Sequence, residues 1–168
     1  AGLRVPAQQV AGEEAKESAF LEAHGRVVVK PARGEQGRGV SVDIDTPDDL
    51  AAAIARAGEC CEKVLLEEYV QGEDLRIIVI DHEVVAAAVR RPAEVVGTGT
   101  LTVADLIRKQ SRRRAAATKG ESTIPMDTET ARCISKVGYQ LDSVLPLNER
   151  LAVRNTANLH TGGTIHDV

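Results

Sequence analysis

A lysine and a glycine-rich loop follow one apolar strand early in the chain. Residues 27–31 read Val-Val-Val-Lys-Pro, and Gly34, Gly37 and Gly39 all come within nine residues of Lys30. A positive charge beside bare backbone N–H groups suits phosphate groups. The spacing is neither that of a P-loop nor a GxGxxG turn opening a helix, because residues 39–44 alternate like a second strand. The pattern predicts a lid over phosphates, with an ordinary hairpin loop as the alternative.

A second set of polar residues lies where another apolar strand ends. Glu67 and Glu68 precede Tyr69 and the apolar Val70, so we expect these acids at a half-buried crossing whose backbone can face an adenine edge. Asp74 comes after a turn at Gly72, and a carboxylate suits the hydroxyls of a ribose. A surface turn with scattered acids explains this segment equally well by itself. Together with the lysine and its loop, the segment predicts a nucleotide held between two sheets.

Three arginines lie on a predicted hairpin of residues 74–80 and 83–91. Arg76 is on the first arm, and Arg90 and Arg91 are on the second. Neighbouring residues of a strand point to opposite sides, so only one of that pair can face a given side. Guanidinium groups that face a cleft bind phosphates and carboxylates through two hydrogen bonds. Solvated strand ends are the alternative, above all for Arg91.

The segment 154–167 is rich in small polar residues and contains paired glycines, which is typical of a loop that closes on an anion. Its His160, His166 and Asp167 suggest a metal site or a triad, but no serine or cysteine nucleophile motif accompanies them. We therefore predict no metal ligand here. The basic cluster at 108–114 is interpreted as a solvated helix face, with recruitment of a polyanionic substrate as the alternative.

The composition argues against several classes of protein. The chain has 168 residues with 43% hydrophobic and 27% charged residues, which is ordinary for a globular protein. Aromatic residues are only 2% and the net charge is −4, so we expect no nucleic-acid partner. We find no apolar run of about eighteen residues and no signal-peptide pattern, and so expect no membrane partner. Three cysteines without a disulfide framework favour a cytoplasmic location.

The order of expected elements defines an α+β fold with a largely antiparallel sheet. Good N-caps support two of the helices, Thr46 before Pro47 and Thr102 before Val103. We expect an extended segment at 1–10, helices at 12–24, 47–57, 103–117 and 128–138, strands at 26–31, 39–44, 63–70 and 151–154, and the hairpin.

The combination of these motifs resembles the ATP-grasp ligases. Val-Val-Lys-Pro, the glycine loop and Glu-Glu-Tyr-Val-x-Gly-x-Asp-x-Arg carry the resemblance, and residues 86–99, 141–146 and 158–164 are similar to the cyanophycin synthetase-like branch. The likeness covers nearly all of the chain. It implies an ATP-grasp fold, with antiparallel sheets, flanking helices and an inserted helical segment. It also implies a ligase that uses ATP to join a carboxylate to an amine through an acyl phosphate, on amino-acid or peptide substrates. A nucleotide-binding regulatory module without ligase activity is the alternative.

The resemblance also implies roles for individual residues. ATP phosphates would be held by Lys30 and covered by the loop 33–39 with Gly34, Gly37 and Gly39. The adenine would meet the side chain of Glu67 and the backbone of Glu68 and Val70, and Asp74 would bind the ribose. Catalytic roles, toward the triphosphate, the acyl phosphate or the acceptor, fall to Arg90, Arg154 and Asn158.

Two departures from the family pattern make the chain look like part of a longer enzyme. A second phosphate-binding lysine is expected upstream of residues 1–6, and the carboxylate and asparagine ligands of Mg²⁺ are expected beyond Val168. We therefore interpret the chain as a partial ATP-grasp domain that uses ATP and Mg²⁺, and we leave open whether it forms a homo-oligomer. Its expected parts are a nucleotide-binding lobe at 25–91, an inserted helical segment at 92–150 and the truncated start of the second lobe's active-site loop at 151–168.

Overall fold

The computed structural model describes residue 2 and residues 4–168. It contains helices and antiparallel sheets, which confirms the α+β class. Ala1 and Leu3, part of the extended segment expected at 1–10, lie outside the described residues. The chain divides into two compact units, Ala1–Gly72 and Glu73–Val168, and this boundary falls inside the lobe predicted at 25–91. The predicted subdivision of the domain stays a prediction.

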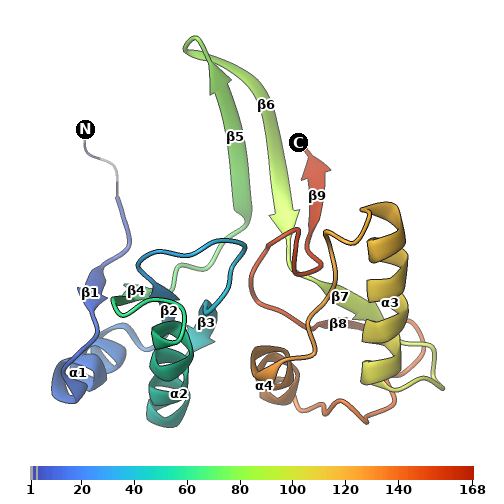
Figure 1. Ribbon diagram of the computed structural model, residues 1–168, viewed down its shortest axis with the longest axis horizontal. Coiled ribbons are helices and arrows are strands. Elements are labelled where there is room, and N and C mark those ends of the chain that lie inside the picture. The colour runs from blue at the N-terminus through green and yellow to red at the C-terminus, as the bar shows by residue number, and fades with distance from the viewer. Residues whose placement is uncertain (1, 3) are drawn as a thin grey trace. The chain divides into compact units, whose positions relative to one another are not determined.

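The first unit is a four-stranded antiparallel sheet with two helices, which Figure 1 shows along the same side of the sheet. Its strand order is β1-β4-β2-β3. The core of this unit combines apolar side chains of both helices with those of the strands. The elements are β1 (Gln8–Val10), α1 (Glu14–His24), β2 (Val27–Pro31), β3 (Ser41–Ile44), α2 (Pro47–Gly58) and β4 (Val64–Glu68).

Buried and half-buried side chains alternate along β2, and this alternation determines on which face of the sheet Lys30 lies. Val27 and Val29 are fully buried in the core, whereas Val28 and Lys30 are half-buried. Because successive side chains point to opposite faces of a strand, the core fixes Lys30 on the face that turns away from the helices. A slip of one residue would expose both valines, so the burial of apolar surface holds the lysine in register.

The second unit contains a three-stranded sheet, β5-β6-β9, and a two-stranded sheet, β7-β8. Its core is aliphatic and gathers α3, α4, β7 and β8 around residues such as Ile107, Ile134 and Leu145, all fully buried. The elements are β5 (Asp74–Ile80), β6 (Glu83–Arg91), β7 (Glu94–Val96), α3 (Val103–Ala117), α4 (Thr128–Lys136), β8 (Arg150–Ala152) and β9 (Thr164–Asp167).

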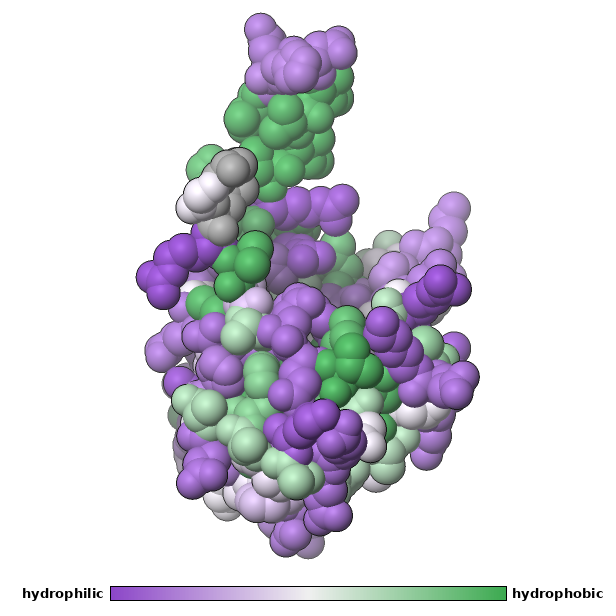
Figure 2. Space-filling view, turned by 90° about the vertical axis from the view of Figure 1, so that its left-hand side faces the viewer, coloured by the Kyte–Doolittle hydropathy of each residue, from purple (hydrophilic) through white to green (hydrophobic). Residues whose placement is uncertain are grey.

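The β5–β6 hairpin is apolar and largely exposed. Asp81 and His82 both adopt positive φ, 50° and 69°, as a tight two-residue hairpin turn requires. Neighbouring Ile78 and Val79 point to opposite faces yet are 44% and 56% exposed, so neither face of this arm is covered within the unit. Figure 2 shows the resulting band of hydrophobic surface below a hydrophilic tip.

The structure corrects several sequence-based boundaries. Strands β7 and β9 were not expected, and the strand expected at 151–154 is Arg150–Ala152. Each of these strands has only three or four residues, which is too short for an alternating pattern to be recognised in the sequence. They are defined by pairing, β7 with β8 and β9 with β6. The helix predicted at 12–24 begins at Glu14, and the one predicted at 128–138 ends at Lys136.

Candidate functional site

Lys30 and Glu67 form an ion pair on the sheet of the first unit. The Lys30 Nζ lies 2.7 Å from Glu67 Oε2, and the side chains are 32% and 17% exposed. Their strands are hydrogen-bonded, with Lys30 opposite Leu65 and Val28 opposite Glu67, so the two charged residues are diagonal neighbours on one face. Gln8 Nε2 donates to the other carboxylate oxygen of Glu67 at 2.5 Å. The partners hold the ammonium group in place at the start of the glycine loop.

The glycine loop joins β2 to β3 and is hydrogen-bonded to the chain before β4 at its first residue. Ala32 N donates to Lys63 O at 2.8 Å, while residues 35–40 bond among themselves. Gly39 has a φ of 69°, and a Cβ there would lie 2.9 Å from Cys60 Sγ. A larger residue would therefore be strained at this position. Gly37 also has a positive φ, whereas Gly34 does not.

The end of β4 presents the residues predicted to face adenine. The Glu68 N–H donates to Ala7 O at 2.9 Å, and the Glu68 carboxylate accepts from Ala7 N at 3.1 Å. The backbone N–H of this residue is thus already used inside the unit. Val70 is 61% exposed, so it lies on the surface of its unit.

In the second unit, Asp74 and Arg90 are opposite one another across the hairpin and form a bidentate ion pair. The Arg90 Nε and Nη2 donate to Asp74 Oδ1 at 3.0 and 2.8 Å, and Nη2 also donates to Oδ2 at 2.8 Å. Such forked contacts fix the guanidinium plane as well as its position. One predicted ribose ligand and one predicted catalytic residue therefore lie together.

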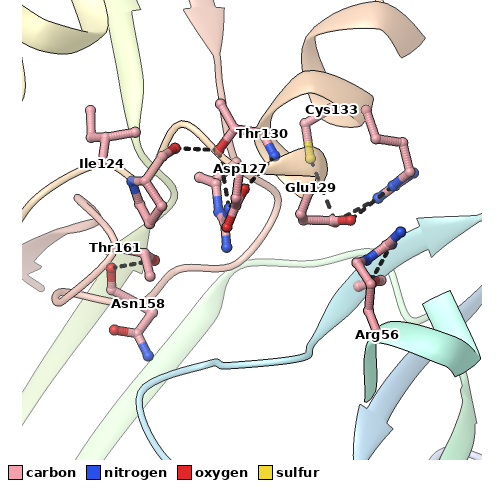
Figure 3. A network of polar contacts seen from close by, with 12 residues as sticks. Arg56, Ile124, Asp127, Glu129, Thr130, Cys133, Asn158 and Thr161 are labelled. Atoms are coloured by element: carbon pink, nitrogen blue, oxygen red, sulfur yellow. Dashed lines mark hydrogen bonds and ion pairs between the residues drawn. The ribbon is translucent and has the colours of Figure 1, made fainter. Parts of the chain in front are cut away.

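Arg154 is buried in the second unit and held by α4. Its Nη1 donates to Asp127 Oδ1 at 2.6 Å and to Thr130 Oγ1 at 3.0 Å, while its Nε has no hydrogen-bond partner among the described residues. Figure 3 shows Asp127 and Thr130 at this network. Burial alone would raise the pKa of the Asp127 carboxyl, but the hydrogen bond from Thr130 N and the charge of Arg154 outweigh it, so the pKa is lowered. Within the part of the chain that the structure describes, Arg154 makes no hydrogen bond to Arg90 or Asn158.

The loop after Arg154 is folded around its own backbone. Asn158 O accepts from Gly163 N at 2.8 Å, and Asn158 Oδ1 accepts from His160 N at 2.8 Å. Gly162 has a φ of 93°, and a Cβ there would lie 2.4 Å from Ile124 Cγ1. The paired glycines are therefore required by close packing, and they fix the turn that presents Asn158.

The sequence interpretation missed Arg114, which anchors this loop. Its Nη2 donates to Gly163 O at 2.5 Å, and its Nε donates to Ser122 Oγ at 2.9 Å. The interpretation of cluster 108–114 as a solvated face is wrong for this residue. The sequence does contain a signal that Arg114 faces inward. It lies seven residues after the apolar Ile107, which is buried, and therefore on the same face of α3.

His160, His166 and Cys133 lie in local contacts of the second unit. His160 Nδ1 lies 3.1 Å from Glu121 O, and His166 Nε2 lies 2.9 Å from Thr164 Oγ1. Burial raises the pKa of the Cys133 thiol to about 11, so this thiol is protonated and unreactive at neutral pH. Within residue 2 and residues 4–168, no group of three or more His, Cys, Asp or Glu side chains could hold a metal ion.

Comparison with known families identifies an ATP-grasp domain. Residues 1–97 match the RimK-like ATP-grasp domain, and the chain belongs to this family. Its expected α+β ATP-grasp fold is confirmed.

The chain is also similar to individual proteins and to a solved structure. A cyanophycin synthetase of a Nostoc species is 38% identical over 144 residues, which is 84% of this chain and 16% of that protein. The glutathione biosynthesis bifunctional protein GshAB of Listeria welshimeri is 30% identical over 143 residues, 82% of this chain and 18% of that protein. A bifunctional glutathione synthetase from Pasteurella multocida superimposes with a TM-score of 0.48 and 25% identity, covering 98% of this chain and 23% of that chain. The chain thus spans about a sixth of the length of the first of these relatives.

The helices in the described part of the chain were compared with what a membrane-spanning helix needs. None of its helices combines the length and the apolar character that a bilayer crossing requires.

Proposed function

We propose that this chain is the nucleotide-handling part of an ATP-dependent carboxylate–amine ligase that acts on amino acids or peptides in the cytoplasm. The observation that carries the proposal is the Lys30–Glu67 pair at the root of the glycine loop. The ion pair fixes a cation beside a loop in which Gly37 and Gly39 adopt positive φ. The chain also belongs to the RimK-like ATP-grasp family and is similar to proteins named as synthetases. Three free cysteines agree with a reducing compartment.

The proposed ATP contacts use both sets of residues. Lys30 binds phosphate oxygens while the loop with Gly34, Gly37 and Gly39 covers them. Glu67 accepts from the adenine amino group, the backbone of Glu68 and Val70 follows the adenine edge, and Asp74 accepts from the ribose hydroxyls. Because Glu67 also pairs with the lysine, adenine and phosphate recognition are coupled through one carboxylate.

The proposed chemistry proceeds in two balanced steps. A carboxylate oxygen of the substrate attacks the γ-phosphorus of ATP, the bond to the bridging oxygen breaks, and ADP leaves. The amine nitrogen then attacks the acyl carbon, phosphate leaves with its electron pair, and the nitrogen loses a proton to give the amide. Arg90, Arg154 and Asn158 are proposed to stabilise negative charge at these stages. The buried Nε of Arg154 provides a donor that no described residue uses.

The proposed substrates follow from the resemblance of three segments to one group of ligases within the family. Residues 86–99, 141–146 and 158–164 resemble the N-acetylglutaminylglutamine synthetases within the cyanophycin synthetase-like branch. A glutamine-type acceptor is therefore the first amine that we would test.

Magnesium, which this family implies, finds no fitting set of ligands in the described residues. No group of three acids, histidines or cysteines gathers there. We therefore assign no residue of this chain to the metal and derive no step through it.

Nucleotide binding tests the proposal. We expect calorimetry to show that Lys30→Ala weakens ADP binding by on the order of tenfold, because a charge-assisted contact to phosphate is lost. Lys16→Ala is the matched control, since Lys16 is an exposed lysine of the same unit that pairs with Glu13. Equal ADP affinity in the wild type and Lys30→Ala would remove Lys30 from the phosphate site.

A further inference from the structure

The second unit contains a cavity of about 900 Å³ that none of the proposed ATP contacts uses. It lies among β6, β7, β8, β9 and α3, and the walls include Arg91, Lys109, Arg113, Arg150 and His166. This volume is in the range of pockets that hold small-molecule ligands. Four permanent cations around one cavity are notable in a chain whose net charge is −4.

The register of the strands separates this cavity from Arg90. Arg91 is opposite Thr164, and Val89 is opposite His166, so Arg91, Thr164 and His166 share one face of the sheet. Arg90 is opposite Ile165 and belongs to the other face, as does its partner Asp74. The cavity is therefore built on the reverse side of the strand that carries a proposed catalytic residue.

Helix α3 aims one face at the cavity. Leu106, Lys109, Gln110 and Arg113 all line it, and their spacing of three and four residues places them side by side on the helix. Arg108 and Arg112 do not line the cavity, although Arg112 is as exposed as its neighbour Arg113, which does. The basic cluster thus has two faces, of which only one belongs to the cavity.

The charges of the cavity are not balanced by protein groups. Glu94 is the only acidic residue in the wall, and it forms an ion pair with Arg150. Arg91, Lys109 and Arg113 make no ion pair with any residue that the structure describes. Three like charges around one open cavity repel each other, and an anion would relieve this repulsion.

We propose that this cavity binds a small molecule carrying at least two phosphate or carboxylate groups, at a site separate from the proposed ATP contacts. Arg91 and Arg113 supply forks for paired oxygens, and the half-buried Lys109 supplies a point charge in the same wall. The side chain of Leu106 gives the floor an apolar part. A ligand with one anionic group would leave most of the repulsion in place.

Two probes distinguish the chemistry of the ligand. Inorganic tripolyphosphate and citrate are titrated into the protein, at equal ionic strength adjusted with sodium chloride, while backbone amide shifts of α3 and β9 are followed by NMR. Saturable shifts with tripolyphosphate, citrate or both support the proposal and assign it to phosphates, carboxylates or either. Shifts no larger than those with sodium chloride alone overturn it.

Charge-removing variants locate the site. We expect Lys109→Gln with Arg113→Gln to weaken binding of the probe by on the order of tenfold or more. Arg108→Gln with Arg112→Gln removes the same charge from the same helix outside the cavity, and should leave the affinity within about twofold. Equal losses in both double variants would show nonspecific attraction and overturn the proposal. Lys30→Ala separates the two sites: it should leave the α3 shifts intact even if it abolishes ADP binding.

Discussion

At the scale of single residues, the contacts of Arg154 determine how its predicted catalytic role can be tested. The guanidinium is buried and shared between Asp127 and Thr130, so an Arg154→Ala variant would leave two polar partners without their donor. Loss of a charged hydrogen bond costs about 1.5–3 kcal/mol of stability, and lowered activity could then reflect unfolding. Activity of that variant must be normalised to its folded fraction.

The partner Asp127 allows the charge of this network to be tested separately. Its lowered pKa means that the folded state favours the ionised carboxylate, so this stabilisation is complete above the ordinary carboxyl pKa and is lost as pH falls through the lowered value. Asparagine retains the N-cap of α4, in which Asp127 accepts from Thr130 N, but removes the charge.

We therefore expect the wild-type free energy of unfolding to exceed that of Asp127→Asn near neutral pH, and the difference to shrink between about pH 5 and pH 2. Urea unfolding at a series of pH values measures it. Asp142→Asn, at an exposed aspartate of the same unit, is the control. A difference that stays constant, or grows on acidification, would contradict the assignment of this charge.

At the scale of elements, helix α3 positions the loop of residues 158–163. Arg114, in the last turn of the helix, donates to the Gly163 carbonyl at one end of the loop. Ser122, which follows the helix, donates through its Oγ to Leu159 O at 2.5 Å near the other end. The loop that presents Asn158 is thus held by side chains from outside it.

Replacing this anchor should loosen the loop without melting the helix. We expect Arg114→Gln to increase amide hydrogen exchange at Gly163, whose N–H is bonded to Asn158 O, by roughly tenfold or more. Arg112→Gln, an exposed arginine of the same helix, should leave that exchange unchanged. If Gly163 stays equally protected in both variants, the loop does not depend on Arg114.

Elements with a strong local pattern could be predicted from the sequence, whereas those defined by distant partners could not. The hairpin at 74–80 and 83–91 and the helix at 103–117 were predicted with the observed bounds, because alternating β-branched residues and the Thr102 cap mark them locally. Strand β9 exists only where it pairs with β6, some seventy residues earlier. Lys30 and Glu67 could be proposed as one site, but their ion pair depends on the β2–β4 register, which no local pattern encodes.

The role of Arg114 could not be predicted either, because it also depends on a contact with a distant segment of the chain. Its charge and its arginine neighbours suggested solvent, and only the packing of the loop against α3 reveals that one guanidinium turns inward. A cluster of like residues on a helix can therefore serve separate purposes on separate faces, here a loop anchor at Arg114 and a cavity wall at Lys109 and Arg113.

At the scale of the whole molecule, each compact unit carries part of the predicted nucleotide-binding set. The first contains the ion pair of Lys30 with Glu67 and the glycine loop, and the second contains the pair of Asp74 with Arg90. The chain spans only about a sixth of the length of its cyanophycin synthetase relative. Catalysis is therefore to be measured on the intact ligase to which we propose that the chain belongs.

Steady-state release of ADP by that intact protein tests the central claim most directly. Carboxylate substrates are combined with glutamine-, aspartate- and glutamate-type acceptors, and each component is omitted in turn. The ligase assignment predicts release of ADP and phosphate only when carboxylate and amine are both present, or slowly with the carboxylate alone. Binding of ATP without turnover of any such acyl substrate would contradict it, and would leave a nucleotide-binding regulatory module in its place.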